Sequence, residues 1–427
     1  MDKHLILHLT LIEDIGPGAI QRIMLLLRQG FEGHKRSGVN GSDLYAFATS
    51  DWMHVFGFSE ITAQKIATGL ADKKLLEREL SLIEEYNINW LTITDESYPK
   101  LLREIYLPPA VLYWQGSSSW DVSAVALAKA DKRVAIVGAR KANDYGQRAV
   151  NTIVPDLVAA GYTIVSGGAV GIDAMAHKAT LQCGGKTIAI LGSGLLRPYP
   201  SANKKLFTAI VDSGGIVASS FPLTMEGLPG NFPARNRIVT GLSRGCLVVQ
   251  AAQKSGALIS AHYAMEQGRE VFAVPGSIGD ELSAGCNALI QEGAKLIMNS
   301  ADILSEFGDR VILPDLRSFN EVGTDKQVLV QQALFVTDSS APLIHSSSPQ
   351  LRSSTPGSPC EMKWNMGLKK YSAAQKHILR VCKQPSSVDD IVNTTQLSFG
   401  QVQSELFNLQ FDGVISQDFT GMWVAIR

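Results

Sequence analysis

Short apolar runs alternate with helical patterns through the middle of the chain. The runs are rich in Val and Ile and are separated by amphipathic stretches of helical length, a pattern typical of a parallel, doubly wound α/β sheet. Right-handed crossovers would bring every strand-to-helix turn to one edge of that sheet. The predicted strands are Trp90–Thr94, Val134–Val137, Thr163–Ser166, Thr187–Leu191, Gly215–Ala218, Cys246–Gln250, Val271–Val274 and Lys295–Ile297.

Apolar positions recur at helical spacing over residues 1–80, which predicts a small all-α N-terminal domain. Two glycine turns, Ile15–Gly18 and Val55–Phe58, each lead into a helical stretch and resemble helix-hairpin-helix motifs, whose backbone N–H groups can hold a DNA phosphate. The alternative is a helical bundle in which the glycines only end helices. The bundle is favoured, because the obvious local positive charge is limited to Arg22, Arg28, Lys65, Lys73 and Lys74.

The last third of the chain divides into a linker and a compact unit. Residues 313–368 are predicted to be a flexible linker, since positions 338–360 alone hold eight serines and four prolines. Residues 369–427 have the pattern of three helices and a β-hairpin, which predicts a winged-helix domain. The third helix carries no Lys or Arg, so a protein-contact or structural role is favoured over duplex binding. The predicted elements are Tyr371–Cys382, Ser387–Val392, Ser398–Leu409, Val414–Gln417 and Met422–Ile426.

Small and basic residues follow the strands of the predicted sheet. The loop after Thr163–Ser166 opens a helix at Ile172, and its small residues would leave backbone N–H groups bare for a phosphate. Basic turns at the same edge would add guanidinium and ammonium groups. The crevice expected between these turns is therefore predicted to bind a polyanion or a nucleotide. The candidate binding residues are Arg140, Ser166, Gly167, Gly168, Lys204, Lys205, Arg235, Asn236, Arg237, Ser255 and Gly256.

A dinucleotide site is disfavoured. The turn after Thr187–Leu191 contains Gly192-Ser-Gly194, but Arg197 occupies the place of the last glycine of a GxGxxG motif. No cofactor is therefore expected at this turn.

Composition narrows the partners and the compartment. The 427 residues carry a formal net charge of −1, so a nucleic-acid site must concentrate positive charge locally. The five cysteines form no CxxC pair, which argues against a disulfide framework or a zinc site and favours a reducing cytoplasm. No apolar run reaches the roughly 18 residues of a membrane span, and no membrane association is expected.

In order along the chain, the motifs VGAR, SGGAVGIDAMAH, GSGLLRPYPSANKKL, FPARNRI, SGALISA and GREVFAVPGS resemble the DNA-processing protein A (DprA/Smf) family over roughly residues 95–310. The resemblance implies an extended Rossmann fold that dimerises, here at residues 81–312. It also implies a cytoplasmic single-stranded-DNA-binding protein that protects incoming DNA during natural transformation and loads RecA recombinase onto it. The family's DNA-contact positions fall on Arg140, Ser166–Gly168, Lys204, Lys205, Arg235 and Arg237.

Two departures from the family pattern bear on catalysis. The family usually has Glu at the positions of Ser220 and Gln250, so two possible general bases are missing. The alternative function is a nucleotide-processing enzyme of related fold, similar to a phosphoribohydrolase, with Asp173 and His177 paired one helical turn apart. A capping Asp173 and a packed His177 are favoured instead, so the protein is predicted to be a binder and not an enzyme.

Overall fold

The computed structural model describes residues 2–29, 41–120, 132–308, 371–411, 414–417 and 422–426. The predicted linker at 313–368 lies outside these residues. Within the described ranges the central sheet has nine strands, in the order β1-β2-β6-β5-β4-β3-β7-β8-β9. Their bounds are β1 (Asn89–Thr92), β2 (Val111–Gly116), β3 (Arg133–Val137), β4 (Thr163–Ser166), β5 (Thr187–Ile190), β6 (Ile216–Ser219), β7 (Gly245–Val248), β8 (Glu270–Ala273) and β9 (Lys295–Leu296).

The strands from β3 to β9 run parallel, which confirms the predicted doubly wound, Rossmann-like α/β core. The sequence pattern missed β2 and wrongly placed Trp90–Thr94 among the parallel strands. β1 pairs antiparallel with β2, and β2 pairs antiparallel with β6. The connection from β1 to β2 contains only the four-residue helix α6 (Lys100–Arg103). The 18 residues between the two strands (93–110) are long enough for either direction, so the length of the connection does not decide it.

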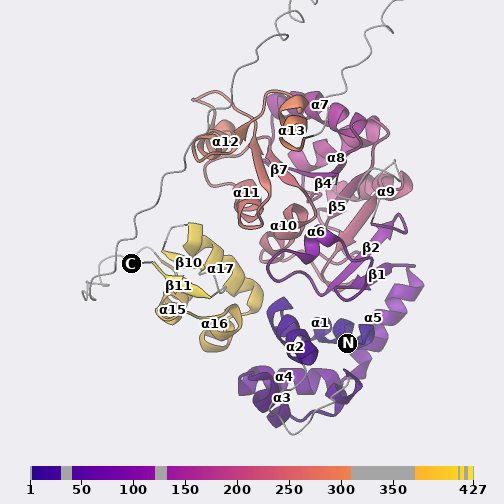
Figure 1. Ribbon diagram of the computed structural model, residues 1–427, viewed down its shortest axis with the longest axis vertical. Helices are drawn as coiled ribbons and strands as arrows, with labels where there is room; N and C mark the ends of the chain where they lie inside the picture. Colours follow the sequence, from indigo (N-terminus) through magenta and orange to yellow (C-terminus); the bar gives the residue numbers. More distant parts are fainter. Residues whose placement is uncertain are drawn as a thin grey trace, which may run out of the picture. The chain divides into compact units, whose positions relative to one another are not determined.

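Helices cover both faces of the sheet (Figure 1). Side chains alternate between the faces of a strand, so Val134 and Ile136 of β3 pack in a different cluster from Ala135 and Val137. One face is covered by α7 (Asp144–Ala159), α8 (Ile172–Gln182) and α9 (Lys204–Asp212), and α13 (Ser300–Glu306) packs with α7. The other face is covered by α6, α10 (Asn231–Gly241), α11 (Gly256–Glu266) and α12 (Glu281–Gln291).

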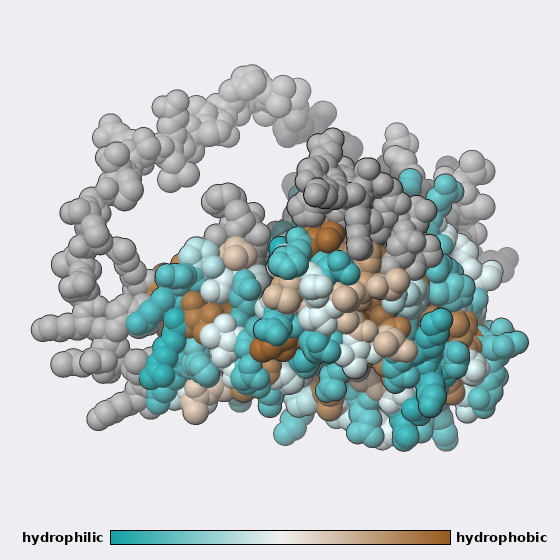
Figure 2. All heavy atoms as spheres, turned by 90° about the horizontal axis from the view of Figure 1, so that it is seen from below, coloured by the Kyte–Doolittle hydropathy of each residue, from teal (hydrophilic) through white to brown (hydrophobic). Residues whose placement is uncertain are grey.

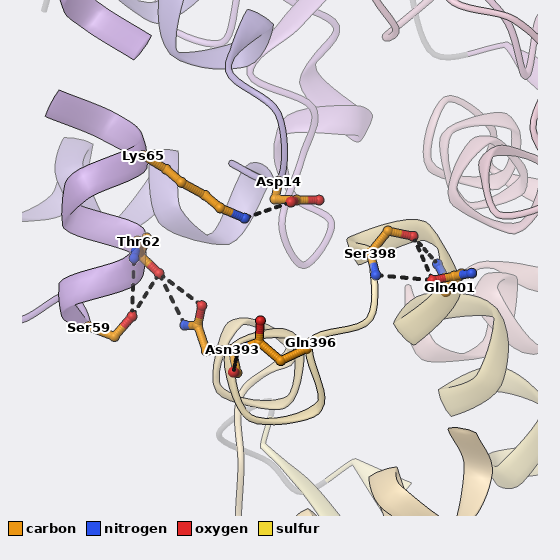
Figure 3. Close-up of polar contacts among 8 residues, drawn as sticks. All are labelled: Asp14, Ser59, Thr62, Lys65, Asn393, Gln396, Ser398 and Gln401. Carbon is orange, nitrogen blue, oxygen red and sulfur yellow. Dashed lines mark hydrogen bonds and ion pairs between the residues drawn. The ribbon is translucent and has the colours of Figure 1, made fainter. Parts of the chain in front are cut away.

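The N-terminal region is helical, as its pattern predicts. Ser59 caps one helix by accepting a hydrogen bond from the N–H of Thr62, and Lys65 pairs with Asp14 at 2.7 Å (Figure 3). The elements are α1 (Lys3–Leu11), α2 (Pro17–Gln29), the 3-10 helix η1 (Gly41–Ala46), α3 (Thr49–Phe56), α4 (Glu60–Ala71) and α5 (Lys73–Glu85). The proposed domain boundary after residue 80 falls inside α5.

The C-terminal unit contains three helices and a two-stranded antiparallel sheet. Ser387 caps the second helix, and Ser398 and Gln401 exchange capping hydrogen bonds before the third (Figure 3). Its elements are α15 (Ala373–Val381), α16 (Val388–Thr395), α17 (Phe399–Phe411), β10 (Ile415–Gln417) and β11 (Trp423–Ala425). This content agrees with the predicted elements, and the winged-helix assignment stays a prediction.

The face of the molecule in Figure 2 is largely hydrophilic, and its hydrophobic residues form small, separate patches. In the part of the chain that the structure describes, no helix combines the length and apolar character that crossing a membrane requires.

Candidate functional site

The candidate site lies where the strand order reverses. β3 has β4 on one side and β7 on the other, so the helices that follow β3 and β7 pack on opposite faces of the sheet. Ligands of doubly wound folds bind at this point, beyond the carboxyl ends of the strands. The turns carrying Arg140, Ser166–Gly168 and Gln250 follow β3, β4 and β7, and therefore meet there.

Two backbone N–H groups of the loop between β4 and α8 already donate hydrogen bonds to a side chain of α8. Asp173 accepts hydrogen bonds through Oδ2 from the N–H groups of Gly167 and Ala169, at 3.1 and 3.3 Å. Ser166 is buried and donates its hydroxyl to the carbonyl of Ile136 at 2.6 Å. The expectation of bare N–H groups is therefore wrong at Gly167 and Ala169. A carboxylate in the first turn of a helix interacts favourably with these donors and with the helix dipole.

Arg235 lies beneath this loop with only 4% of its surface exposed. Its Nη1 donates to the carbonyl oxygens of Gly167, directly after β4, and Ile190, the last residue of β5. Burial lowers its pKa to about 10, and the neighbouring Asp173 opposes that shift, so the guanidinium remains charged at neutral pH. Arg235 thus supplies a fixed positive charge under the floor of the crevice.

Arg237 faces a different part of the molecule. Its Nη1 donates to the carbonyl of Tyr106 at 2.8 Å. Burial lowers the pKa of its guanidinium, and the neighbouring phenols of Tyr263, Tyr98 and Tyr106 oppose that shift. The prediction that Arg235 and Arg237 aim at the same edge is therefore wrong. Residues two positions apart do not share a helix face, so the shared motif separates these guanidiniums.

Three predicted cations are exposed: Arg140, which follows β3, and Lys204 and Lys205, which begin α9. Asn203 donates through Nδ2 to the carbonyls of Gly168 and Ala169, at 2.9 and 3.1 Å, which holds the start of α9 against the glycine loop. The two lysines therefore lie beside the loop that Arg140 flanks.

The sequence analysis missed two aromatic residues at this site. The guanidinium of Arg140 lies 5.4 Å from the ring centroid of Phe232, and the ring of Tyr199 lies 5.5 Å from the same ring. Tyr199 is 47% exposed. The sequence does contain a signal for this site, because Phe232 lies next to the basic segment Arg235–Arg237. The bases of single-stranded nucleic acids stack on such aromatic rings.

The turn at Ser255 and Gly256 joins the site through Asn236. Asn236 accepts a hydrogen bond from Nε of Arg235 at 3.1 Å and donates through Nδ2 to the carbonyl of Gly256 at 3.4 Å. Ser255 caps α11 by accepting from the N–H of Ala257 at 3.2 Å. These residues shape the crevice and hold Arg235 in place.

Gln250 has a structural partner that explains an amide at this position. Its Nε2 donates to Oδ1 of Asn143 at 2.8 Å, and its Oε1 accepts from the N–H of Asn143 at 3.2 Å. Asn143 caps α7. A carboxylate cannot donate the first of these bonds, so Gln250 secures the start of α7 in a way that Glu could not.

Asp173 and His177 are both buried, at 6% and 0% exposure. Burial raises the pKa of Asp173 and lowers that of His177 to about 3. His177 hydrogen-bonds through Nδ1 to Oγ1 of Thr187 at 2.7 Å. These contacts agree with a capping and a packing role. In the described part of the chain, no three His, Cys, Asp or Glu side chains are arranged to hold a metal ion.

Residues 89–308, which include the whole sheet from β1 and all the crevice residues, match the family model of DNA recombination-mediator protein A. The chain belongs to this DprA/Smf family. Protein Smf of Synechocystis is 37% identical over 337 residues, covering 78% of this chain and 79% of that protein. DNA processing protein DprA of Streptococcus pneumoniae is 46% identical over 216 residues, covering 51% of this chain and 73% of that protein.

The fold is also similar to that of a solved family member. The X-ray structure of DprA from Streptococcus pneumoniae superposes with a TM-score of 0.55 at 36% identity, covering 67% of this chain and 92% of that one. The family and these relatives place the chain among DNA-processing proteins.

Proposed function

We propose that the protein binds single-stranded DNA in the crevice at the carboxyl ends of β3, β4 and β5. The observation that carries the proposal is the exposed Arg140 guanidinium beside the Phe232 ring, with Tyr199 next to that ring. Single-stranded nucleic-acid sites combine cations that follow the backbone with aromatic rings on which bases stack. Phosphate contacts and stacking both tolerate any base, so little sequence preference is expected.

The proposed DNA contacts divide by exposure. Arg140, Lys204 and Lys205 contact phosphates, and Gly256 is exposed at the rim. The buried or half-buried members shape the crevice: Ser166, Gly167, Gly168, Arg235, Asn236 and Ser255. Among them, Arg235 also adds a positive charge from below. Arg237 is left out of the proposed contact set because of its tyrosine surroundings.

A binding role is favoured over a nucleotide-processing enzyme. General acid–base chemistry needs a titratable side chain within reach of the substrate, whereas Asp173 and His177 are buried and hydrogen-bonded. Incubation with nucleoside monophosphates should release no base, and base release above the buffer rate would favour the enzyme.

The finer roles rest on the family resemblance. We propose a cytoplasmic homodimer with a C-terminal winged helix, which protects incoming DNA in natural transformation and loads a RecA-type recombinase onto it. Light scattering of the full chain should give twice the monomer mass. Recombinase filaments should form faster on strands coated with single-strand-binding protein when this protein is present. An unchanged filament rate would contradict recombinase loading.

Fluorescence anisotropy with labelled oligonucleotides tests the DNA-binding proposal directly. Single strands should bind more tightly than blunt duplex, and affinity should fall with salt with a slope of about −0.7 per neutralised phosphate. Equal affinity for duplex, or an affinity independent of salt, would refute it.

A further inference from the structure

A cavity of about 760 Å³ lies on the face of the sheet that α9 covers. Its apolar floor includes Leu191, Phe207 and Val217, and its rim includes Tyr86 from the turn between α5 and β1. Lys204 lines this cavity and also begins the helix that Asn203 ties to the glycine loop. The cavity therefore opens beside a proposed phosphate contact, and its volume is that of a small-ligand site.

The polar lining of the cavity has unused hydrogen-bonding groups. The side-chain amides of Asn87, Asn89 and Gln115 make no hydrogen bond within the described part of the chain. Amide side chains can pair with the edges of nucleobases, because they offer a donor and an acceptor together. The ring of Tyr86 is 46% exposed at the rim, where it can stack on a base.

The two ends of the cavity carry opposite charges. Its charged lining residues within the described chain are Lys204 and Asp212, at opposite ends of α9. Eight residues of helix separate them by about 12 Å along the axis. A phosphate is therefore favoured at the Lys204 end, which is also the positive end of the helix dipole. The carboxylate of Asp212 repels a phosphate but can accept from an exocyclic amine of a base.

We propose that this cavity holds one nucleotide of the bound DNA strand, with its base against Tyr86 and the amide side chains and its phosphate on Lys204. This inference rests on the proposed single-strand binding, since Lys204 links the cavity to the crevice. The base inside the cavity leaves the stack of its neighbours, so the strand turns at this point.

The test compares variants of the full chain in binding to a labelled 20-nucleotide single strand. Tyr86→Ala should weaken binding about tenfold, the loss expected for one stacked base, and Gln115→Ala should weaken it about threefold. The matched control is Tyr106→Ala, which removes another exposed tyrosine, 56% exposed and outside the cavity; it should change binding less than twofold. Melting temperatures identify any variant that fails to fold.

Cross-linking tests the same cavity without a substitution. A strand carrying 5-iododeoxyuridine should cross-link to Tyr86 on irradiation, as located by mass spectrometry. Absence of this cross-link, with a strand that the protein binds, would overturn the assignment of the cavity to a nucleotide of the strand.

The two proposals fail in different ways. If the wild-type protein does not bind single strands, the proposed function itself is wrong. If the wild type binds and Arg140→Ala weakens it, while Tyr86→Ala and Gln115→Ala bind normally and no cross-link forms at Tyr86, only the cavity assignment is overturned.

Discussion

Replacement of Arg140 by alanine should remove one phosphate contact without harming the fold. The side chain is exposed and lies against the ring of Phe232, so the cost in folding free energy should stay within about 0.5–1 kcal/mol. A hydrogen bond to a charged group contributes about 1.5–3 kcal/mol. The lower value corresponds to a loss of about tenfold in affinity for single-stranded DNA.

Salt titration distinguishes a phosphate contact from an indirect effect. Loss of one contact should make the slope of log K against log salt less steep by about 0.7. The matched control is Lys295→Ala, because Lys295 lies on the edge strand β9, three strands away from β3 in the sheet. Fluorescence anisotropy at several salt concentrations measures both quantities. A slope equal to that of the wild type, in a variant with an unchanged melting temperature, would refute the assignment of Arg140.

Four further predictions test other parts of the molecule. Phe232→Leu should weaken single-strand binding by about 1–3 kcal/mol with little change in the salt slope, as anisotropy would show, because stacking is lost and no cation is removed. Gly167→Ala should lower the free energy of unfolding in urea by about 1–3 kcal/mol, since its Cβ would clash with the guanidinium of Arg235. The pKa of His177 is about 3 in the folded state, below its unfolded value near 6.5, so protonation of this side chain favours the unfolded state. Its contribution to the free energy of unfolding should therefore fall by about 1.4 kcal/mol for each pH unit below pH 6.5. His177→Gln should remove that part of the dependence of stability on acid pH. Deletion of residues 338–427 should leave single-strand affinity within about twofold in a gel shift, because α17 carries no Lys or Arg; a large loss would place the C-terminal unit in the DNA site.

Much of the fold could be predicted because parallel strands buried on both faces have a distinctive sequence pattern. All the predicted strands correspond to observed ones, and the helix predicted from Ile172 begins there. β2 is equally apolar, but it lies after a short helix and outside the repeating strand–helix rhythm. Hydrophobic periodicity reports which positions are buried and not the direction in which two strands pair, so the antiparallel direction of β1 and β2 could not be predicted.

The site was less predictable, because sequence position fixes neither the direction of a side chain nor its partners. The motif shared by Arg235 and Arg237 carries two guanidiniums, yet the first enters the floor of the crevice and the second turns toward Tyr106. Phe232, three residues before Arg235, shapes the exposed surface more directly than either.

The glycine loop changes the expected mode of phosphate binding. Its sequence is that of an anion cradle, but the carboxylate of Asp173 already occupies the N–H groups of Gly167 and Ala169. A phosphate entering at those two groups would have to displace a buried carboxylate that the Arg235 charge stabilises. DNA phosphates are therefore expected to bind at the exposed side chains of Arg140, Lys204 and Lys205. Side chains can follow a flexible strand, whereas a closed cradle would select one fixed phosphate, and this difference fits a site that holds single-stranded DNA of any sequence.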